Sequence, residues 1–163
     1  MSDVLADTHS IVWFLFDPSR LSPAADAALT TATAAQSGKV TISAITLVEV
    51  NYLSGKKTFP YSGVLPRLIA LASDPNERIE VLPLTLQVAQ AMDLVPRDEV
   101  PDMPDRIVAA TAVAYKLPLV SQDTEIAATS LATCRPGRID CGSRRAALVG
   151  QDSNLDVTDK SPE

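Results

Sequence analysis

The chain has 163 residues, 46% of them hydrophobic and 21% charged, which is the composition of a globular domain large enough for its own core. Its net charge of −6 argues against a polyanionic partner unless bound cations offset it. No apolar run approaches the roughly 20 residues of a membrane helix, and the first residues lack the basic segment of a signal peptide. We therefore expect a cytoplasmic protein that does not engage a membrane.

Strand-like and helix-like segments alternate along the chain. The strand-like segments are short and apolar, and they cover 4–7 (VLAD), 39–43 (KVTIS), 78–84 (RIEVLPL) and 117–123 (LPLVSQD). Helical patterns lie between and after them, at 10–16, 21–38, 44–55, 64–73, 85–94, 105–117 and 124–131. Strands separated by helices imply right-handed crossovers. The sequence therefore predicts an α/β fold with a short, mainly parallel sheet and helices on both faces.

Several of these helical patterns carry start and stop signals. Ser22 is the expected N-cap of the second helix and Gly38 its expected end. Gly55 is expected to close the third helix, and Thr85 to cap the fifth. Pro66 is compatible with the fourth helix only if it lies in the first turn, where its missing N–H has no intrahelical partner to lose.

The two cysteines, Cys134 and Cys141, lie close together near the C-terminus. Two free thiols are expected in a cytoplasmic protein, although a disulfide between them stays open. The single histidine, His9, is far away in sequence, which gives little support to a zinc site.

Four acidic residues stand where a carboxylate needs an explanation. Asp7 and Asp123 each follow a strand-like run, and ligands bind outside the carboxyl ends of the strands in open parallel sheets. Glu49 and Asp105 lie within otherwise apolar helical patterns. Taken singly, each has an ordinary explanation as a loop residue, a helix N-cap, a first-turn charge or the partner of a lysine. Projected together toward one edge of a sheet, the four would repel one another unless a cation were bound.

Carboxylate oxygens grouped in this way suit magnesium or manganese rather than zinc. A bound ion of this kind lowers the pKa of its water and neutralises phosphoryl oxygens. The pattern therefore indicates phosphodiester hydrolysis.

Three segments resemble PIN-domain ribonucleases, and most closely the VapC-type toxins of bacterial toxin–antitoxin pairs: ADTHSIVWFL (6–15), ISAITLVEV (42–50) and PDMPDRIVAATAVAYKLPLVSQD (101–123). The resemblance implies a three-layer PIN-like nuclease domain over 1–133. It also implies a catalytic and metal-binding cluster that consists of Asp7, Glu49, Asp105 and Asp123. The implied activity is Mg²⁺-dependent (or Mn²⁺-dependent) endonucleolytic cleavage of single-stranded or structured RNA.

The resemblance further implies protein partners: a cognate antitoxin that neutralises the enzyme, within a homodimer or a toxin–antitoxin hetero-oligomer. The chain departs from the family after the last aspartate, where the family has a short edge strand that often carries an aromatic residue, because residues 131–140 (LATCRPGRID) contain no aromatic; residues 134–150 are therefore expected to be an atypical C-terminal segment in which this strand is partly replaced. Residues 151–163 are polar, and we expect a disordered tail.

Three further residues are candidates for supporting roles in the cluster. Thr8 matches a family position whose hydroxyl or backbone often supports the site. Thr46 precedes Glu49 by about one helical turn and is expected on the same face. Arg106 is a candidate phosphate contact, with an ion pair to a surface acid as the equal alternative.

Other residues near these motifs favour structural interpretations. His9 is expected to pack or to form a hydrogen bond rather than to act as a general base. Trp13 is expected to be a buried or interface aromatic rather than a platform for a nucleobase. Lys56 and Lys57 are expected to be a solvated pair after Gly55, although a basic pair near the site would also steer RNA.

Two other functions stay open at this point. A haloacid-dehalogenase-like phosphatase would use Asp7 as a nucleophile, but it needs a second aspartate two residues later, where this chain has His9. A PIN-like adaptor without catalytic activity would bind RNA or protein, and the presence of all four acids argues against it. Magnesium binding would separate the adaptor from the nuclease.

Overall fold

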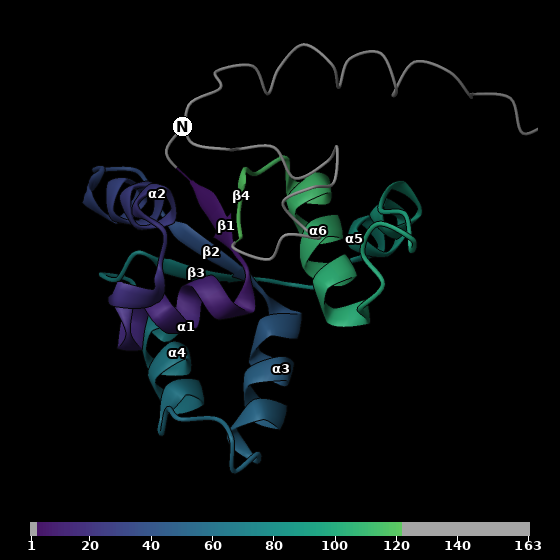
Figure 1. The fold of residues 1–163 in the computed structure, drawn as a ribbon. Coiled ribbons are helices and arrows are strands. Elements are labelled where there is room, and N and C mark those ends of the chain that lie inside the picture. Colours follow the sequence, from purple (N-terminus) through teal and green to yellow (C-terminus); the bar gives the residue numbers. More distant parts are fainter. Residues whose placement is uncertain (1–2, 122–163) are drawn as a thin grey trace, which may run out of the picture.

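The computed structural model describes residues 3–121 (Figure 1). Its elements in chain order are β1 (Val4–Ala6), α1 (Thr8–Phe16), the 3₁₀ turn η1 (Pro18–Arg20), α2 (Pro23–Ala34), β2 (Val40–Ser43), α3 (Ala44–Ser54), α4 (Val64–Ser73), β3 (Ile79–Leu82), α5 (Leu86–Ala91), the 3₁₀ turn η2 (Met92–Leu94), α6 (Met103–Tyr115) and β4 (Leu119–Val120). The strands and helices predicted within this range are all present. The helix predicted at 124–131, both cysteines and the two C-terminal segments lie outside the described residues.

The four strands form one parallel sheet in the order β3-β2-β1-β4, which confirms the predicted α/β fold (Figure 1). From β1 through β2 to β3 the chain advances in one direction across the sheet, and α1, α2 and α4 cover one face. From β3 the chain returns over the other face through α5 and α6 to reach β4. The direction of the connections thus reverses between β1 and β4, which is the place where open α/β sheets bind ligands.

Helix boundaries follow local hydrogen bonds, with one difference from the prediction. The Ser22 hydroxyl accepts from the backbone N–H of Ala25 at 3.2 Å, as expected of an N-cap. Helix α2 ends at Ala34, however, because Ala35 has an extended backbone, and Gly38 belongs to the following turn, where its N–H donates to the Ala35 carbonyl. The predicted stop was therefore wrong by one turn of helix.

The fourth and fifth helices agree with the expected signals. Pro66 lies in the first turn of α4, which begins after Gly63 in a left-handed conformation (φ 72°) that glycine adopts without strain. The Thr85 hydroxyl accepts from the N–H of Val88 at 3.4 Å and caps α5. After Ala91 this helix tightens into η2 instead of continuing as a regular helix to residue 94.

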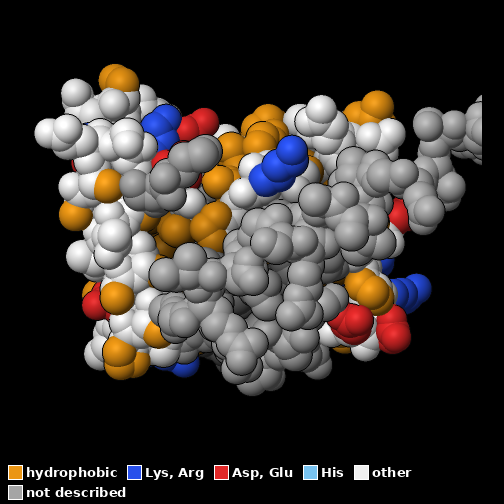
Figure 2. All heavy atoms as spheres, turned by 90° about the horizontal axis from the view of Figure 1, so that it is seen from above, with side chains coloured by type: hydrophobic (Ala, Val, Ile, Leu, Met, Phe, Trp, Pro, Cys, Tyr) orange, Lys and Arg blue, Asp and Glu red, His pale blue; other side chains and the backbone are white. Residues whose placement is uncertain are grey.

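Within residues 3–121, no helix has the length and apolar character to span a bilayer. On the face shown in Figure 2, the described lysine and arginine side chains lie scattered among uncharged and acidic ones.

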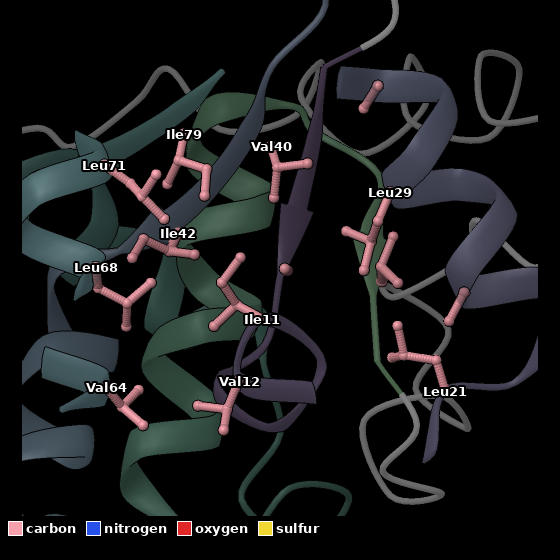
Figure 3. Close-up of a cluster of buried hydrophobic side chains, with 14 of the residues drawn as sticks. Ile11, Val12, Leu21, Leu29, Val40, Ile42, Val64, Leu68, Leu71 and Ile79 are labelled. Atoms are coloured by element: carbon pink, nitrogen blue, oxygen red, sulfur yellow. The ribbon is translucent and has the colours of Figure 1, made fainter. Parts of the chain in front are cut away.

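Alternate residues of each strand enter separate cores on the two faces of the sheet. Figure 3 shows Leu68 and Leu71 of α4 directed toward Ile42 and Ile79 of the sheet, and Val64 of α4 opposite Val12 of α1. The larger core contains the strand residues Ala6, Val40, Ile42, Ile79 and Val120, and the core under α5 and α6 contains Leu5, Leu82 and Leu119. Helices therefore cover both faces of the sheet, although Glu80 in the middle of the edge strand β3 has a side chain that is 46% exposed.

Candidate active site

Asp7 lies directly after β1, at the carboxyl edge of the sheet, and is only 3% exposed. Its Oδ1 accepts from the backbone N–H of Ser10 at 2.6 Å, which makes Asp7 the N-cap of α1. Its Oδ2 accepts from the hydroxyl of Ser121. Both carboxylate oxygens thus have donors, and these hydrogen bonds offset the loss of water around a buried charge. The N-cap role, one of the ordinary explanations for this aspartate, is present, and it does not exclude a second role.

Ser121 was not singled out from the sequence, although a signal for it existed. β1 and β4 are paired in parallel with Ala6 opposite Val120, and the N–H of Asp7 donates to the Val120 carbonyl at 3.0 Å. The residues that follow the two strands must therefore lie side by side. A parallel pairing of the first and last predicted strands would have predicted this contact.

Thr8 connects the end of β1 to α3. Its hydroxyl donates to Oε2 of Glu49 at 2.7 Å and lies 3.3 Å from the hydroxyl of Thr46. Thr8 and Thr46 are buried, while Glu49 is partly exposed. Thr8 therefore fixes one oxygen of the Glu49 carboxylate, while Thr46 contacts Thr8, and the carboxylate stays in reach of solvent. The alternative of a lysine partner for Glu49 is not realised among the described residues.

Asp105 lies in the first turn of α6, where the helix dipole favours a negative charge, and it is partly buried. Its neighbour Arg106 forms no ion pair with an acid within residues 3–121, and the phosphate contact stays a prediction. The Arg106 guanidinium donates to the backbone carbonyls of Met92 and Val95 at 3.1–3.4 Å. Met92 begins η2 and Val95 directly follows it, so Arg106 attaches the α5–η2 segment to α6 and supports the position of the turn that carries Asp105.

A buried pair of hydroxyls connects α6 to the carboxyl end of β2. Thr111 donates to the Ile107 carbonyl at 2.7 Å, and the hydroxyl oxygens of Ser43 and Thr111 are 3.0 Å apart. Because Thr111 uses its single proton within the helix, Ser43 donates to Thr111. This contact sets α6 against the same sheet edge that carries Asp7 and Thr8.

The structure therefore brings three of the four predicted acids to elements that meet at the carboxyl edge of the sheet. Asp7 follows β1, Glu49 is on α3, and Asp105 begins α6, which packs against both α3 and β2. Asp123 lies outside the described residues. Within residues 3–121, no three acidic, histidine or cysteine side chains are grouped closely enough to hold a metal ion. The four-acid cluster accordingly stays a prediction.

The residues given structural interpretations have defined neighbours. The rings of His9 and Trp13 are 5.5 Å apart on the outer side of α1, and Trp13 packs in part against the larger core. Lys56 lies with its Nζ 4.4 Å from the centroid of the Tyr52 ring. Ser10, whose N–H binds Asp7, has a buried hydroxyl without a hydrogen-bond partner in the described part of the chain.

A parallel sheet with a buried carboxylate at its switch point defines an α/β protein with an acidic site between the first and last strands. The model of the PIN domain family matches residues 4–131, and the chain belongs to this family. The predicted three-layer PIN-like fold is thereby confirmed.

Individual relatives agree with this assignment. The chain is 29% identical over 127 residues to Ribonuclease VapC22 from Mycobacterium tuberculosis, an alignment that covers 77% of this chain and 91% of the relative. Its fold is similar to that in the crystal structure of VapBC2 from Rickettsia felis bound to a DNA fragment from their promoter (TM-score 0.56, 18% identity, 79% of this chain and 94% of that one). A toxin–antitoxin complex from Klebsiella pneumoniae is also similar (TM-score 0.51, 22% identity, 78% and 93%).

Proposed function

We propose that this protein is a metal-dependent endoribonuclease and the toxin of a toxin–antitoxin pair. The observation that carries the proposal is the buried Asp7 at the switch point of the sheet, next to a Glu49 carboxylate that Thr8 fixes at 2.7 Å. The similarity to Ribonuclease VapC22 over most of both chains supports the same activity.

The donor set at this edge fits a hard divalent cation. Asp7, Glu49, Asp105 and Asp123 offer carboxylate oxygens, the ligands preferred by Mg²⁺ and Mn²⁺, and the described range contributes no cysteine to compete for a softer metal. We assign these four residues to the ion or ions. A bound divalent ion would supply a hydroxide at neutral pH and neutralise charge on the phosphate.

The protein side chains position this donor set. The Ser10 N–H and the Ser121 hydroxyl each donate to one oxygen of Asp7, so that Asp7 presents its carboxylate in a fixed orientation. Thr8, which also contacts Thr46, donates to one oxygen of Glu49, and the other oxygen is available to orient a water molecule. Asp105 adds negative charge at the start of α6, and Arg106 positions that turn through its hydrogen bond to the Val95 carbonyl.

The first experiment measures cleavage of a mixed pool of single-stranded RNA with magnesium, with a chelator, and by the Asp7→Asn variant. Asparagine preserves the N-cap acceptor, and the Ser121 hydroxyl can accept where it now donates, so the variant should fold. We expect loss of cleavage by about 10² or more in the variant and complete loss with the chelator. The matched control is Asp93→Asn, which changes an exposed acid on η2 and should cleave normally.

Full cleavage by a folded Asp7→Asn or Asp105→Asn protein would refute the assignment of these residues. Magnesium titration of the wild type distinguishes the nuclease from a PIN-like adaptor without catalytic activity. A chain that neither binds magnesium nor cleaves RNA is a PIN-like adaptor, whereas magnesium binding without cleavage points to an RNA target missing from the pool.

We also propose a cognate antitoxin as protein partner, in a hetero-oligomer built on a toxin homodimer. The support is the similarity to VapBC2 and to the Klebsiella pneumoniae toxin–antitoxin complex. Expression of the chain alone should arrest bacterial growth, and co-expression with its antitoxin should restore it. Growth arrest that persists in the Asp7→Asn variant would contradict a toxicity based on cleavage.

A further inference from the structure

One side of α1 carries a row of neighbouring side chains that begins next to Thr8, with the His9 and Trp13 rings tilted by 44°. His9 directly follows Thr8, and its ring lies 5.5 Å from that of Trp13, one helical turn further on. The Cζ atom of Arg20 lies 4.6 Å from the centroid of the Trp13 ring. Three side chains from α1 and η1 therefore form a continuous row that leads away from Thr8 and Glu49. We call His9, Trp13 and Arg20 the α1 row.

Arg20 is held in place from two directions. Its guanidinium lies over the Trp13 ring, and its Nη1 donates to the hydroxyl of Tyr61 at 3.4 Å. Tyr61 in turn donates to Oδ2 of Asp17 at 3.2 Å, which fixes the phenol. Arg20 is nevertheless exposed to solvent. A long side chain fixed in this way loses less conformational entropy when it binds a ligand than a free surface arginine does.

A second cation is held on the segment that carries Tyr61. Lys56 follows α3, and its ammonium group lies over the Tyr52 ring at 4.4 Å. The connection 55–63 between α3 and α4 thus contributes Lys56 near one end and Tyr61 near the other. Tyr61 attaches this connection to Arg20. Arg20 and Lys56, each over an aromatic ring, are thus connected through residues 55–63, beside the helices α1 and α3 that carry Thr8 and Glu49.

We propose that Arg20 binds a backbone phosphate of the RNA strand outside the scissile position, with the α1 row setting the path of the strand away from the site. This inference rests on the proposed nuclease function. The chain carries a net charge of −6, and the candidate site itself is acidic, so the RNA flank needs cations that lie beside the carboxylates. A guanidinium gives phosphate two parallel hydrogen bonds, and the exposed His9 ring at the other end of the row suits a base of a single strand.

The test is the binding of a fluorescein-labelled single-stranded RNA of about 16 nucleotides to the full chain, in chelator so that no cleavage occurs. Arg20→Gln should weaken binding by about threefold to tenfold. It should also reduce the slope of log affinity against log salt by about 0.7, the value for one phosphate contact on a single strand. Arg20→Lys should retain the slope. The matched control is Arg78→Gln, which lies just before β3 at the opposite edge of the sheet and should bind like the wild type.

The single tryptophan of the chain provides a second, local readout. RNA bound at Arg20 should change the fluorescence of Trp13 in the wild type and in Arg78→Gln, and the change should be lost in Arg20→Gln. Affinity, salt slope and Trp13 response that are the same in Arg20→Gln and Arg78→Gln would overturn the inference. If wild-type cleavage with magnesium persists in that case, the nuclease function stands and the strand takes another path. If the wild type neither cleaves nor binds RNA, both proposals fail.

Loss of antitoxin binding by Arg20→Gln, with RNA binding unchanged, would also overturn the inference and assign the α1 row to a protein ligand.

Discussion

Replacement of Thr8 by valine removes one hydroxyl and keeps the size and branching of the side chain. Two interactions are lost: the donation to Glu49 at 2.7 Å and the contact with the Thr46 hydroxyl at 3.3 Å. A hydrogen bond to a charged group contributes about 1.5–3 kcal/mol, and a buried hydroxyl left without its partner costs about 1 kcal/mol more. Because Glu49 is partly exposed, the contribution of its hydrogen bond is expected near the lower end of that range. We therefore expect the free energy of unfolding to fall by about 2 kcal/mol.

Thermal unfolding in chelator measures this loss without any contribution from metal. For a chain of this size, about 2 kcal/mol corresponds to a decrease in Tm of roughly 4–8 °C. Thr30→Val, an exposed threonine on α2, is the matched control and should change the free energy of unfolding by less than about 0.5 kcal/mol. If Thr8→Val is no less stable than Thr30→Val, the buried connection between α1 and α3 does not stabilise the fold.

A double-mutant cycle isolates the pair. Thr8→Val, Glu49→Ala and the combined variant should give a coupling energy of about 1 kcal/mol, because each single variant already removes the same hydrogen bond. Additive effects of the two substitutions would refute a direct interaction between these side chains.

Ser121→Ala removes the hydroxyl that donates to the buried Oδ2 of Asp7. Urea titration should show that the free energy of unfolding falls by about 1–3 kcal/mol in Ser121→Ala and is restored in Ser121→Thr. Equal stability of the two variants would contradict the contact. Lys116→Gly should increase the free energy of unfolding by about 1 kcal/mol, because Lys116 ends α6 in a left-handed conformation (φ 57°), and the same thermal scan would show no increase if that backbone carried no strain. Gly63→Ala should reduce it by a similar amount, since no atom within 4 Å would contact the added methyl group and only the backbone conformation is tested. Leu29→Ala, at a fully buried core position, should lower it by about 2–5 kcal/mol, and a loss below about 1 kcal/mol would mean that the core collapses around the gap.

The parts of the site that follow from local sequence were predictable. Asp7 ends a short apolar run, and the position of a residue at a strand end depends only on that strand and on the parallel sheet around it. Thr46 and Glu49 share a helix face because three residues of a helix span almost one turn. Asp105 lies in the first turn of α6, as expected, although the helix starts two residues before the predicted boundary.

The contacts between distant segments could not be predicted in the same way. Glu49 accepts from Thr8 across 41 positions, and this distance is set by the packing of α1 against α3 on the larger core. The Arg106 contacts depend on where α5 shortens into η2 and exposes the carbonyls of Met92 and Val95, which no pattern in residues 85–94 indicated. Propensity and periodicity describe single elements, whereas these hydrogen bonds depend on how the elements dock.

The pairing of β1 with β4 has a consequence for the order of events during synthesis. Asp7 is translated early, yet its partner Ser121 follows the last described strand, and at about 5–20 residues per second the ribosome needs on the order of ten seconds to make the chain between them. Until β4 pairs with β1, the Oδ2 of Asp7 lacks this donor and the edge of the sheet beside β1 stays open. A polypeptide whose translation stops before residue 119 can build both cores in part but not this carboxylate environment. The fold thus delays completion of the hydrogen bonds around Asp7 until β4 and Ser121 have been translated, and fragments from interrupted translation carry the aspartate without its Ser121 donor.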